Sequence, residues 1–518
     1  MRSLLAGLAL AVATLAIGLV LARAGRPSPQ RRPHVLSPAA RGVYVTGGVP
    51  ARDPAMHELL AGDFMQLVLA VDRIRGTGRV QPHRAELRAL LDKAEPMRQH
   101  GPALAAAWHD LLAALDHWVG VPEDSRTFDR EAHEISAKVR AVSDQLAAAG
   151  IGYFLEGDVL ISRGHAHALV FAYRVEDVRF VHVLGLPRRV LSLRRIDRVN
   201  LMHNELGMQS EDLGDPVLLL DQIDQHVVRR TLPVLAPGAA YPLAEDGDAW
   251  GQRPDARELM AAAGRAIREE LAAALGPDVA NAAEVARLLA ERAERLETIG
   301  ERLAPYNLRV ARVSELLMPE RMLDRLSAYV LPDERDQLLA IELALVDRDA
   351  VEVARRCGEV VANSVRRHEA QHGIDADRTD SLRYPEPLAE LLGPAYGDDG
   401  EPSRRVERAR AELAAYLSQI ANDPVTPRLA LWNVVRHALT ARMAGSAESY
   451  AGVLIATGLA RELAIPSPGP VIHDREIDRV RLSRIARPLA AVSGDRLRAA
   501  ARALWRDWYG EPLIPIVD

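Results

Sequence analysis

The pentapeptide His368-Glu369-Ala370-Gln371-His372 places two imidazoles one helical turn apart, with a carboxylate between them. Residues four apart on an α-helix lie on the same face, so both rings can direct a nitrogen at one metal ion. Glu369 lies about 100° round the helix from His368, close enough to act on a water held by that metal without being a ligand. The spacing is the one that a metal-dependent hydrolase needs.

The residues before this pentapeptide predict the helix that carries it. Apolar residues recur there at spacings of three and four, at Ala354, Cys357, Val361 and Val365. The same steps reach His368 and His372, so the histidines continue an inward-facing stripe of a helix over 349–372. The arginines expected on the solvated face are Arg355, Arg356, Arg366 and Arg367. Gly373 follows directly, where a helix commonly ends, and Asp375 and Asp377 are expected turn residues.

Composition indicates an ordinary globular protein, because 48% of the 518 residues are hydrophobic and 26% are charged. The length allows two to four domains. Lys93 and Lys138 are the only lysines, and this arginine bias is typical of a GC-rich bacterial genome. The net charge is −6, both signs are interspersed, and no basic block carries interleaved aromatic residues, so nucleic acid is not an expected partner. Cys357 is the only cysteine and is predicted to be a buried structural thiol.

The amino terminus predicts export. Residues 4–22 carry no charge, with Arg2 before them and four arginines soon after. Residues 1–24 are therefore either a signal peptide, cleaved after the small-x-small sequence Ala22-Arg23-Ala24, or a membrane anchor. The expected protein is periplasmic or secreted in the first case. In the second case it is attached to the inner membrane through residues 4–22.

The rest of the chain divides by composition and period, and the fold class expected is mainly α (α+β). The parts are a linker at 25–55, a helical region at 56–150, an α+β region at 151–250, a helical hairpin at 251–316 and a domain with the histidine pair at 317–518. The α+β region predicts two short strands around a turn at Glu156-Gly157-Asp158, then strands at 168–173 and 179–184. Further helices are expected near 320–330, 335–346, 386–392, 403–421, 428–443 and 447–463.

A second histidine pair lies in the α+β region. His165 and His167 alternate on a predicted strand, so their rings would point the same way and could bind a metal. No carboxylate or cysteine accompanies them at a diagnostic spacing. Together with His182 and His203, they are interpreted as surface or hydrogen-bonded histidines.

A catalytic zinc normally has three protein ligands and one open position for water, so a further residue must complete the pair at His368 and His372. Glu412 is the best candidate, because 405–420 predicts a helix with an apolar side and Glu412 lies at its border, one turn before Tyr416. The alternative for Glu412 is a solvated glutamate paired with Arg408, four residues earlier.

Glu390 is the runner-up as third ligand. It follows His372 by 18 residues, but Pro387 and Gly393 leave little helix around it.

The stretch Glu412-Leu413-Ala414-Ala415-Tyr416 resembles E-x-x-A-[DY], the second motif of the gluzincins, which are metallopeptidases with HExxH on one helix and a glutamate ligand on a later one. The resemblance covers about 350–421. It implies a helical zincin-like domain in which His368, His372 and Glu412 bind Zn²⁺ and Glu369 activates water for attack on a protein or peptide substrate. Where relatives often have an aspartate that orients a ligand histidine, this chain has Tyr416.

Such a hydrolase also needs a donor to the oxyanion, and His437, Tyr384 and Tyr396 are the candidates. Two alternatives to the peptidase stay open at this point. One is a non-catalytic helical envelope scaffold with a relic or structural metal site, and the other is a metal-dependent hydrolase of non-peptide bonds.

Overall fold

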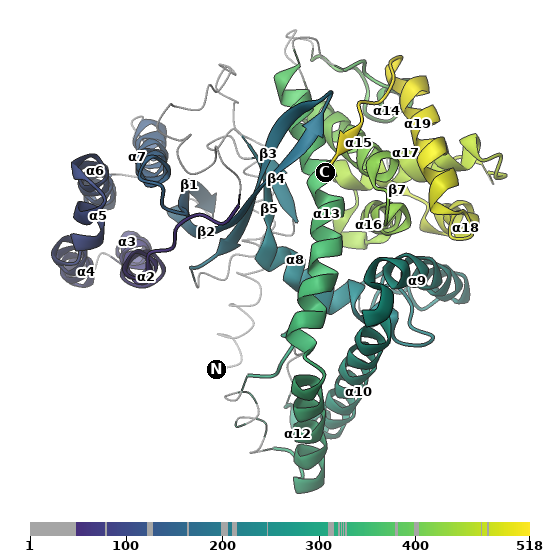
Figure 1. Cartoon of the computed structure of the whole chain (residues 1–518), viewed down its shortest axis with the longest axis horizontal. Helices are drawn as coiled ribbons and strands as arrows, with labels where there is room; N and C mark the ends of the chain where they lie inside the picture. Colours follow the sequence, from purple (N-terminus) through teal and green to yellow (C-terminus); the bar gives the residue numbers. More distant parts are fainter. Residues whose placement is uncertain are drawn as a thin grey trace. The chain divides into compact units, whose positions relative to one another are not determined.

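The structure is a computed structural model. It describes residues 48–518, apart from 78–79, 122–127, 163–164, 198–205, 210–214, 246, 309–314, 320–321, 323, 325, 327–328, 379–381, 398–402, 468 and 474–475. The described part is mainly helical with a small sheet, so the expected mainly α (α+β) class is confirmed. The chain forms two compact units, one mainly from residues before 221 and the other mainly from 221–517 (Figure 1).

Several sequence predictions fall outside the described residues. These are the signal or anchor at 1–24, most of the linker at 25–55, His203, and much of the helix expected near 320–330. Among the residues that the structure describes, no helix has both the length and the apolar character that crossing a bilayer requires.

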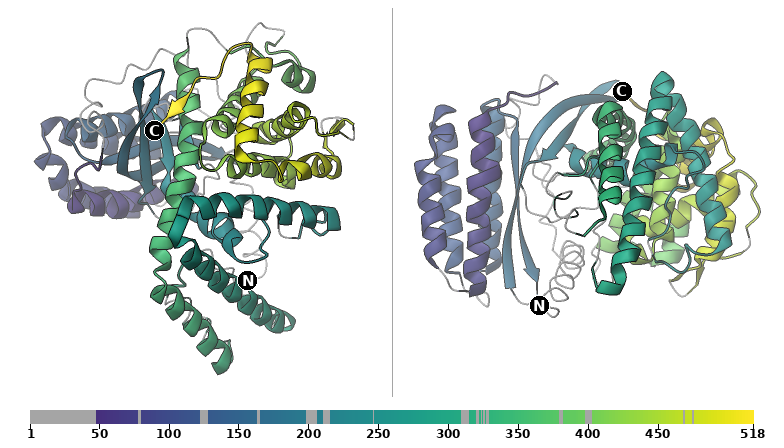
Figure 2. Two further views of the ribbon diagram at one scale, coloured as in Figure 1. Left: turned by 45° about the vertical axis from the view of Figure 1, so that its right-hand side comes forward. Right: turned by 90° about the horizontal axis from the view of Figure 1, so that it is seen from below.

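The first unit begins with helices that pack on each other. They are α2 (Pro54–Glu58), η2 (Leu59–Asp63), α3 (Phe64–Thr77), α4 (Val80–Asp92), α5 (Glu95–Gln99), α6 (Pro102–Val119) and α7 (Phe128–Ala148). Phe64 and Trp108 are buried between them with ring centroids 4.9 Å apart. The helices stand side by side along one face of the sheet (Figure 2).

Five strands of the first unit follow in the order β1-β2-β3-β5-β4. Their bounds are β1 (Tyr153–Ser162), β2 (His165–Val183), β3 (Leu186–Arg195), β4 (Gly207–Gln209) and β5 (Pro216–Leu219). The pairs β1 with β2 and β4 with β5 are antiparallel, whereas β3 and β5 run parallel. The expected antiparallel sheet therefore also contains a parallel pair.

The turn predicted at Glu156-Gly157-Asp158 is wrong. The strand β1 runs through it unbroken, and Gly157 lies opposite Val170 of β2. A Cβ atom at Gly157 would lie 2.9 Å from Cγ2 of Val139, so the glycine lets α7 approach the strand closely. The two strands predicted at 168–173 and 179–184 are likewise one strand, β2.

The second unit is a helical assembly with short strands. Its elements are α8 (Leu220–His226), η3 (Val227–Thr231), η4 (Pro233–Leu235), α9 (Pro254–Leu275), η5 (Gly276–Asp278), α10 (Val279–Leu303), η6 (Ala304–Tyr306), α12 (Pro332–Asp347), α13 (Ala350–Asp377), α14 (Glu386–Leu392), α15 (Arg404–Asn422), α16 (Pro427–Leu439), η7 (Ala441–Met443), α17 (Ala447–Glu462), β6 (Ile472–His473), β7 (Glu476–Ile477), α18 (Arg479–Leu489), α19 (Gly494–Tyr509) and β8 (Ile516–Val517). Most of the helices predicted after residue 331 are present within a few residues of their expected bounds.

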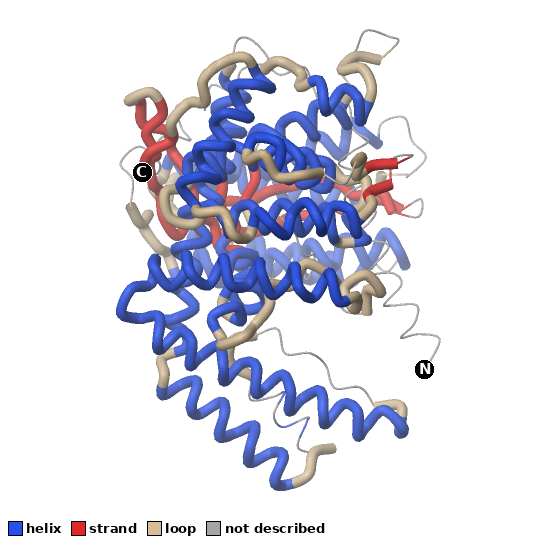
Figure 3. Tube along the Cα trace, turned by 90° about the vertical axis from the view of Figure 1, so that its right-hand side faces the viewer, coloured by secondary structure: helices blue, strands red, loops and turns tan. Residues whose placement is uncertain are grey.

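The helices α9 and α10 are separated at Gly276, as the sequence predicts, but they do not pack along each other as a hairpin. The helix α10 lies along α12, whereas α9 packs against α16 and α18 (Figures 1 and 3). The partner of each helix is therefore distant in the sequence, which a local pattern cannot reveal.

The helix α13 does not end at Gly373. It continues to Asp377, and Gly373, which is buried, lies inside it. The side chain of Gln371 donates to Oδ1 of Asp375 at 2.8 Å, and α15 packs along the helix. Because these contacts support another turn, Asp375 and Asp377 belong to the helix rather than to a turn that ends it.

The prediction that Arg366 and Arg367 face solvent is also wrong, since each is only 4% exposed. They donate to the side-chain and backbone oxygens of Asn363 at 2.7 and 2.6 Å. The helix is enclosed here because α9, α10, α15 and η3 all pack against it. A helix packed on several sides has no wide solvated face for its charged residues.

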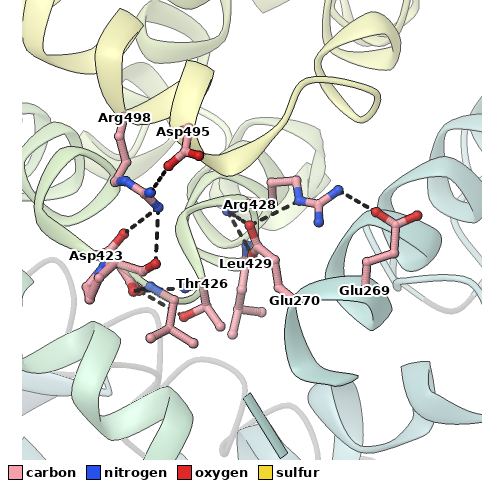
Figure 4. A network of polar contacts seen from close by, with 10 residues as sticks. Glu269, Glu270, Asp423, Thr426, Arg428, Leu429, Asp495 and Arg498 are labelled. Atoms are coloured by element: carbon pink, nitrogen blue, oxygen red, sulfur yellow. Dashed lines mark hydrogen bonds and ion pairs between the residues drawn. The ribbon is translucent and has the colours of Figure 1, made fainter. Parts of the chain in front are cut away.

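The start of α16 is held by two other helices (Figure 4). Glu270 of α9 accepts from the backbone N–H groups of Arg428 and Leu429 at 3.0 and 3.1 Å, and from Nε of Arg428 at 3.0 Å. A carboxylate at a helix N-terminus satisfies free N–H groups and complements the helix dipole. Arg498 of α19 donates to the backbone oxygen of Asp423, just before α16, at 3.4 Å. These contacts fix the direction of the helix.

Two glycine substitutions test the close packing of α16 on α17. A Cβ at Gly452 would lie 2.4 Å from the backbone oxygen of Val434, so Gly452→Ala must push the two helices apart. We expect a loss of about 1–3 kcal/mol in the free energy of unfolding, measured by urea denaturation.

Gly358→Ala on α13 is the matched control. Its added methyl meets only Oδ1 of Asp224, at 3.8 Å, and alanine is the better helix former. We expect no loss, and a gain of up to about 1 kcal/mol. Equal destabilisation by the two variants would contradict the described packing.

Candidate metal centre

Three potential ligand atoms converge where α13 packs on α15. Nε2 of His368 and Nε2 of His372 lie 3.1 Å apart. Oε2 of Glu412 lies 3.6 Å from Nε2 of His368, and Oε1 lies 3.8 Å from Nε2 of His372. Among the residues that the structure describes, this is the one group of three or more side chains that could hold a metal ion.

The separations suit a tetrahedral ion. Ligand atoms about 2.0–2.1 Å from a tetrahedral metal lie roughly 3.3 Å from each other. The two Nε2 atoms, 3.1 Å apart, are close to that value, and each lies within 4 Å of one or the other carboxylate oxygen of Glu412. With one ligand atom taken from each residue, the three atoms lie within 4.8 Å of one another. Two nitrogens and one carboxylate oxygen also form the donor set of a site that keeps a fourth position open.

The site is largely but not fully buried. The side chains of His368, His372 and Glu412 are 9%, 14% and 17% exposed. The three ligands are therefore mostly packed within the protein, with a small part of each side chain exposed to solvent.

The local charges prepare two of the three groups for metal binding. Burial opposes ionisation of Glu412, but hydrogen bonding from His368 and the charge of both histidines hold its pKa at about 2. Burial lowers the pKa of His372 to about 4. Burial also acts to lower the pKa of His368, but Glu412, Glu369 and Glu448 outweigh it, and this pKa is raised. At neutral pH the metal-free site therefore holds an ionised Glu412 and a neutral His372, the forms that bind metal.

Glu369 lies beside the three ligands without being one of them. Its Oε1 is 3.9 Å from Nε2 of His368, and its side chain is buried. A carboxylate in this position is close to the ion that the three ligands could hold.

Tyr416 and His437 form the next layer on one side of the centre. The ring of Tyr416 lies edge-on to that of His368, with centroids 4.3 Å apart. Its hydroxyl is 3.5 Å from Nε2 of His437, which comes from α16. Burial, with help from Glu412 and Glu448, raises the pKa of Tyr416 well above its ordinary value, so its hydroxyl keeps its proton at neutral pH.

Glu448 is a site residue that the sequence reasoning missed. It is buried at the start of α17, close enough to raise the pKa of His368, and it forms an ion pair with Arg408 at 3.2 Å. The sequence placed Arg408 beside Glu412 instead. The only local signal for Glu448 is an acidic residue in the first turn of a helix, which is too common to mark a site.

The remaining candidates take other positions. Glu390, the alternative third ligand, is exposed on α14. The hydroxyl of Tyr384 donates to the backbone oxygens of Leu388 and Gly393 at 3.2 and 2.9 Å. Tyr396 is 59% exposed. None of the three has a described contact with the cluster.

Cys357 is buried, as predicted, and burial raises the pKa of its thiol to about 12. The side chains of His165 and His167 lie outside the described residues.

Comparison of the chain with protein family models, with curated proteins and with solved structures finds no match.

Metal content separates the two candidate third ligands. We expect one metal ion per chain after purification and dialysis, measured by plasma emission spectroscopy. Glu412→Gln removes an anionic ligand and should lower the affinity by at least about tenfold, since even outer partners of metal ligands contribute that much. Glu390→Gln changes an exposed glutamate and should leave the content unchanged. A loss of metal in the second variant alone would contradict the site.

Proposed function

We propose that this chain is an exported bacterial zinc-dependent peptidase. The observation that carries the proposal is the convergence of His368 and His372 of α13 with Glu412 of α15 on a space that suits one tetrahedral ion. Zinc is the metal that most often takes two histidines and one glutamate in hydrolytic sites. The resemblance of the two motifs to those of the gluzincins supports peptide bonds as the target, and the uncharged residues 4–22 support export.

Bound zinc would polarise the substrate carbonyl and lower the pKa of a coordinated water to about 7. Glu369 is the group that handles the proton. Its carboxylate accepts the proton as the water attacks the carbonyl carbon, and then delivers it to the leaving amine. Its Oε1, 3.9 Å from Nε2 of His368, supports this role.

We assign Tyr416 as the hydrogen-bond donor to the oxyanion that develops on the substrate carbonyl oxygen. The hydroxyl keeps its proton at neutral pH and lies next to the ligand His368. In the unliganded site this hydroxyl lies 3.5 Å from Nε2 of His437, and it would exchange that long contact for the oxyanion. A fixed donor near a developing negative charge stabilises the transition state more than the ground state.

Glu369→Gln tests the general base. The variant keeps the shape of the side chain but cannot accept the proton, so we expect stoichiometric zinc with cleavage of a peptide library reduced by at least about a hundredfold. The library is analysed by mass spectrometry, and Glu390→Gln serves as the matched exposed control. Unchanged cleavage by the Glu369→Gln variant would contradict the role of Glu369 as general base.

A scaffold with a structural or relic site predicts a different pattern. In that case the wild type cleaves nothing in the library, and His368→Ala folds and behaves like the parent.

Tyr416→Phe tests the oxyanion donor. Loss of one such donor typically costs about 100–1000-fold in kcat, and we expect KM and zinc content to change little. Tyr384→Phe is the matched control, because its hydroxyl is engaged with backbone oxygens away from the cluster. Equal kinetics for Tyr416→Phe and the wild type would remove Tyr416 from the mechanism.

A further inference from the structure

A group of cationic side chains lies on the side of the centre marked by Tyr416. From the ligand His368, the contacts lead to Tyr416 and then to His437, whose Nε2 is 3.4 Å from a guanidinium nitrogen of Arg436. Arg436 and His437 lie in the last turn of α16, the helix whose start is held by Glu270. Arg230 belongs to the same group, since its charge, like that of Arg436, lowers the pKa of His437.

Arg230 and Arg436 are like charges that lie within electrostatic reach of each other. Burial lowers the pKa of Arg230 to about 10, and Arg436 is the charge that adds most to this shift. Arg230 lies in the π-helix η3, an uncommon conformation that is frequent at functional sites. Neither arginine is fully buried.

These arginines differ from the others nearby in having no acidic partner. Arg442 pairs with Glu245 at 2.6 Å, and Arg408 pairs with Glu448. Within the described part of the chain, no ion pair joins Arg230 or Arg436 to a carboxylate. Guanidinium groups keep their protons at neutral pH, so two that repel each other without an anion cost free energy that a bound anion would offset.

Donor atoms of the same group are also left without partners. Within the described residues, Nε of Arg436, Nε2 of His226 and Nδ1 of His437 are buried and accept or donate no hydrogen bond. His226 is only 7% exposed and sits among the same charges, because Arg230 and Arg436 both lower its pKa. Buried polar atoms without partners in a native fold call for a ligand, an ion or water.

We propose that Arg230 and Arg436 form a subsite that binds a carboxylate of the peptide substrate, with His226 and His437 beside it. The proposal rests on the proposed function for the identity of the substrate, although the anion site itself does not. Only Tyr416 and His437 separate Arg436 from the ligand His368, so this carboxylate lies within a few residues of the scissile bond. It belongs either to the free C-terminus of the peptide or to an acidic side chain. Glu412 and Glu448 act on Tyr416 with the opposite sign to Arg436, so an anionic group of the substrate is favoured at the arginines and disfavoured at these carboxylates.

Binding of a small probe tests the subsite without any need for catalysis. Glutarate is titrated into the full-length protein and followed by calorimetry, with neutral glutaramide as the reference ligand. We expect glutarate to bind the wild type, and to bind Arg230→Gln and Arg436→Gln at least about tenfold more weakly, because each removes charge-assisted hydrogen bonds. Arg229→Gln, an exposed neighbour, should bind like the wild type. Either arginine variant suffices if the other fails to fold.

Equal binding of glutarate to all four proteins, or none to the wild type, would overturn the subsite. If the metal rather than the arginines bound glutarate, all four proteins would bind it equally. That result would therefore also overturn the subsite. Failure of the peptidase proposal is seen separately, as absence of zinc or of cleavage, and leaves the glutarate result intact.

Two peptide pairs then identify the source of the carboxylate. One pair differs by a free or amidated C-terminus, and the other by Glu or Gln near the scissile bond. A fall in kcat/KM of about tenfold on amidation assigns the C-terminal carboxylate, and the same fall from Glu to Gln assigns the side chain. No change in either pair would contradict recognition of a substrate carboxylate.

Discussion

The packing of α13 against α15 brings one buried carboxylate against two imidazoles, and the second unit is arranged round that contact. Glu412 stays ionised there because His368 and His372 offset the cost of burial. The same helix α15 also packs against α16, α17 and α19, so the ligand position is fixed from several sides. A bound cation would replace the mutual contacts of the three groups with ligand bonds.

The surroundings of this contact are polarised. Glu369 and Glu448 add negative charge close to His368, whereas Arg230 and Arg436 gather beyond Tyr416 and His437. The candidate cation site at His368, His372 and Glu412 and the proposed anion site at Arg230 and Arg436 are thus separated by the side chains of Tyr416 and His437. The capping of α16 by Glu270 matters here, because that helix carries both Arg436 and His437.

Local periodicity predicted the helices that bear the ligands, and the spacing of His368 and His372 predicted that their rings meet. Glu412 could be proposed because it borders an apolar stripe of its own helix. Glu448, Arg230 and Arg436 could not, since each approaches the centre from a distant segment and none belongs to a motif. The same limit explains the errors at Gly373 and Arg366, where contacts with other helices override the local preference for a helix end or a solvated face.

The central claim is that one ion is held by His368, His372 and Glu412. Crystals of the purified protein, measured at the absorption edge of zinc, test it most directly. The account predicts a single anomalous peak about 2.0–2.2 Å from Nε2 of each histidine and from a carboxylate oxygen of Glu412. A zinc-loaded protein that shows its peak elsewhere, or none at this position, would contradict it.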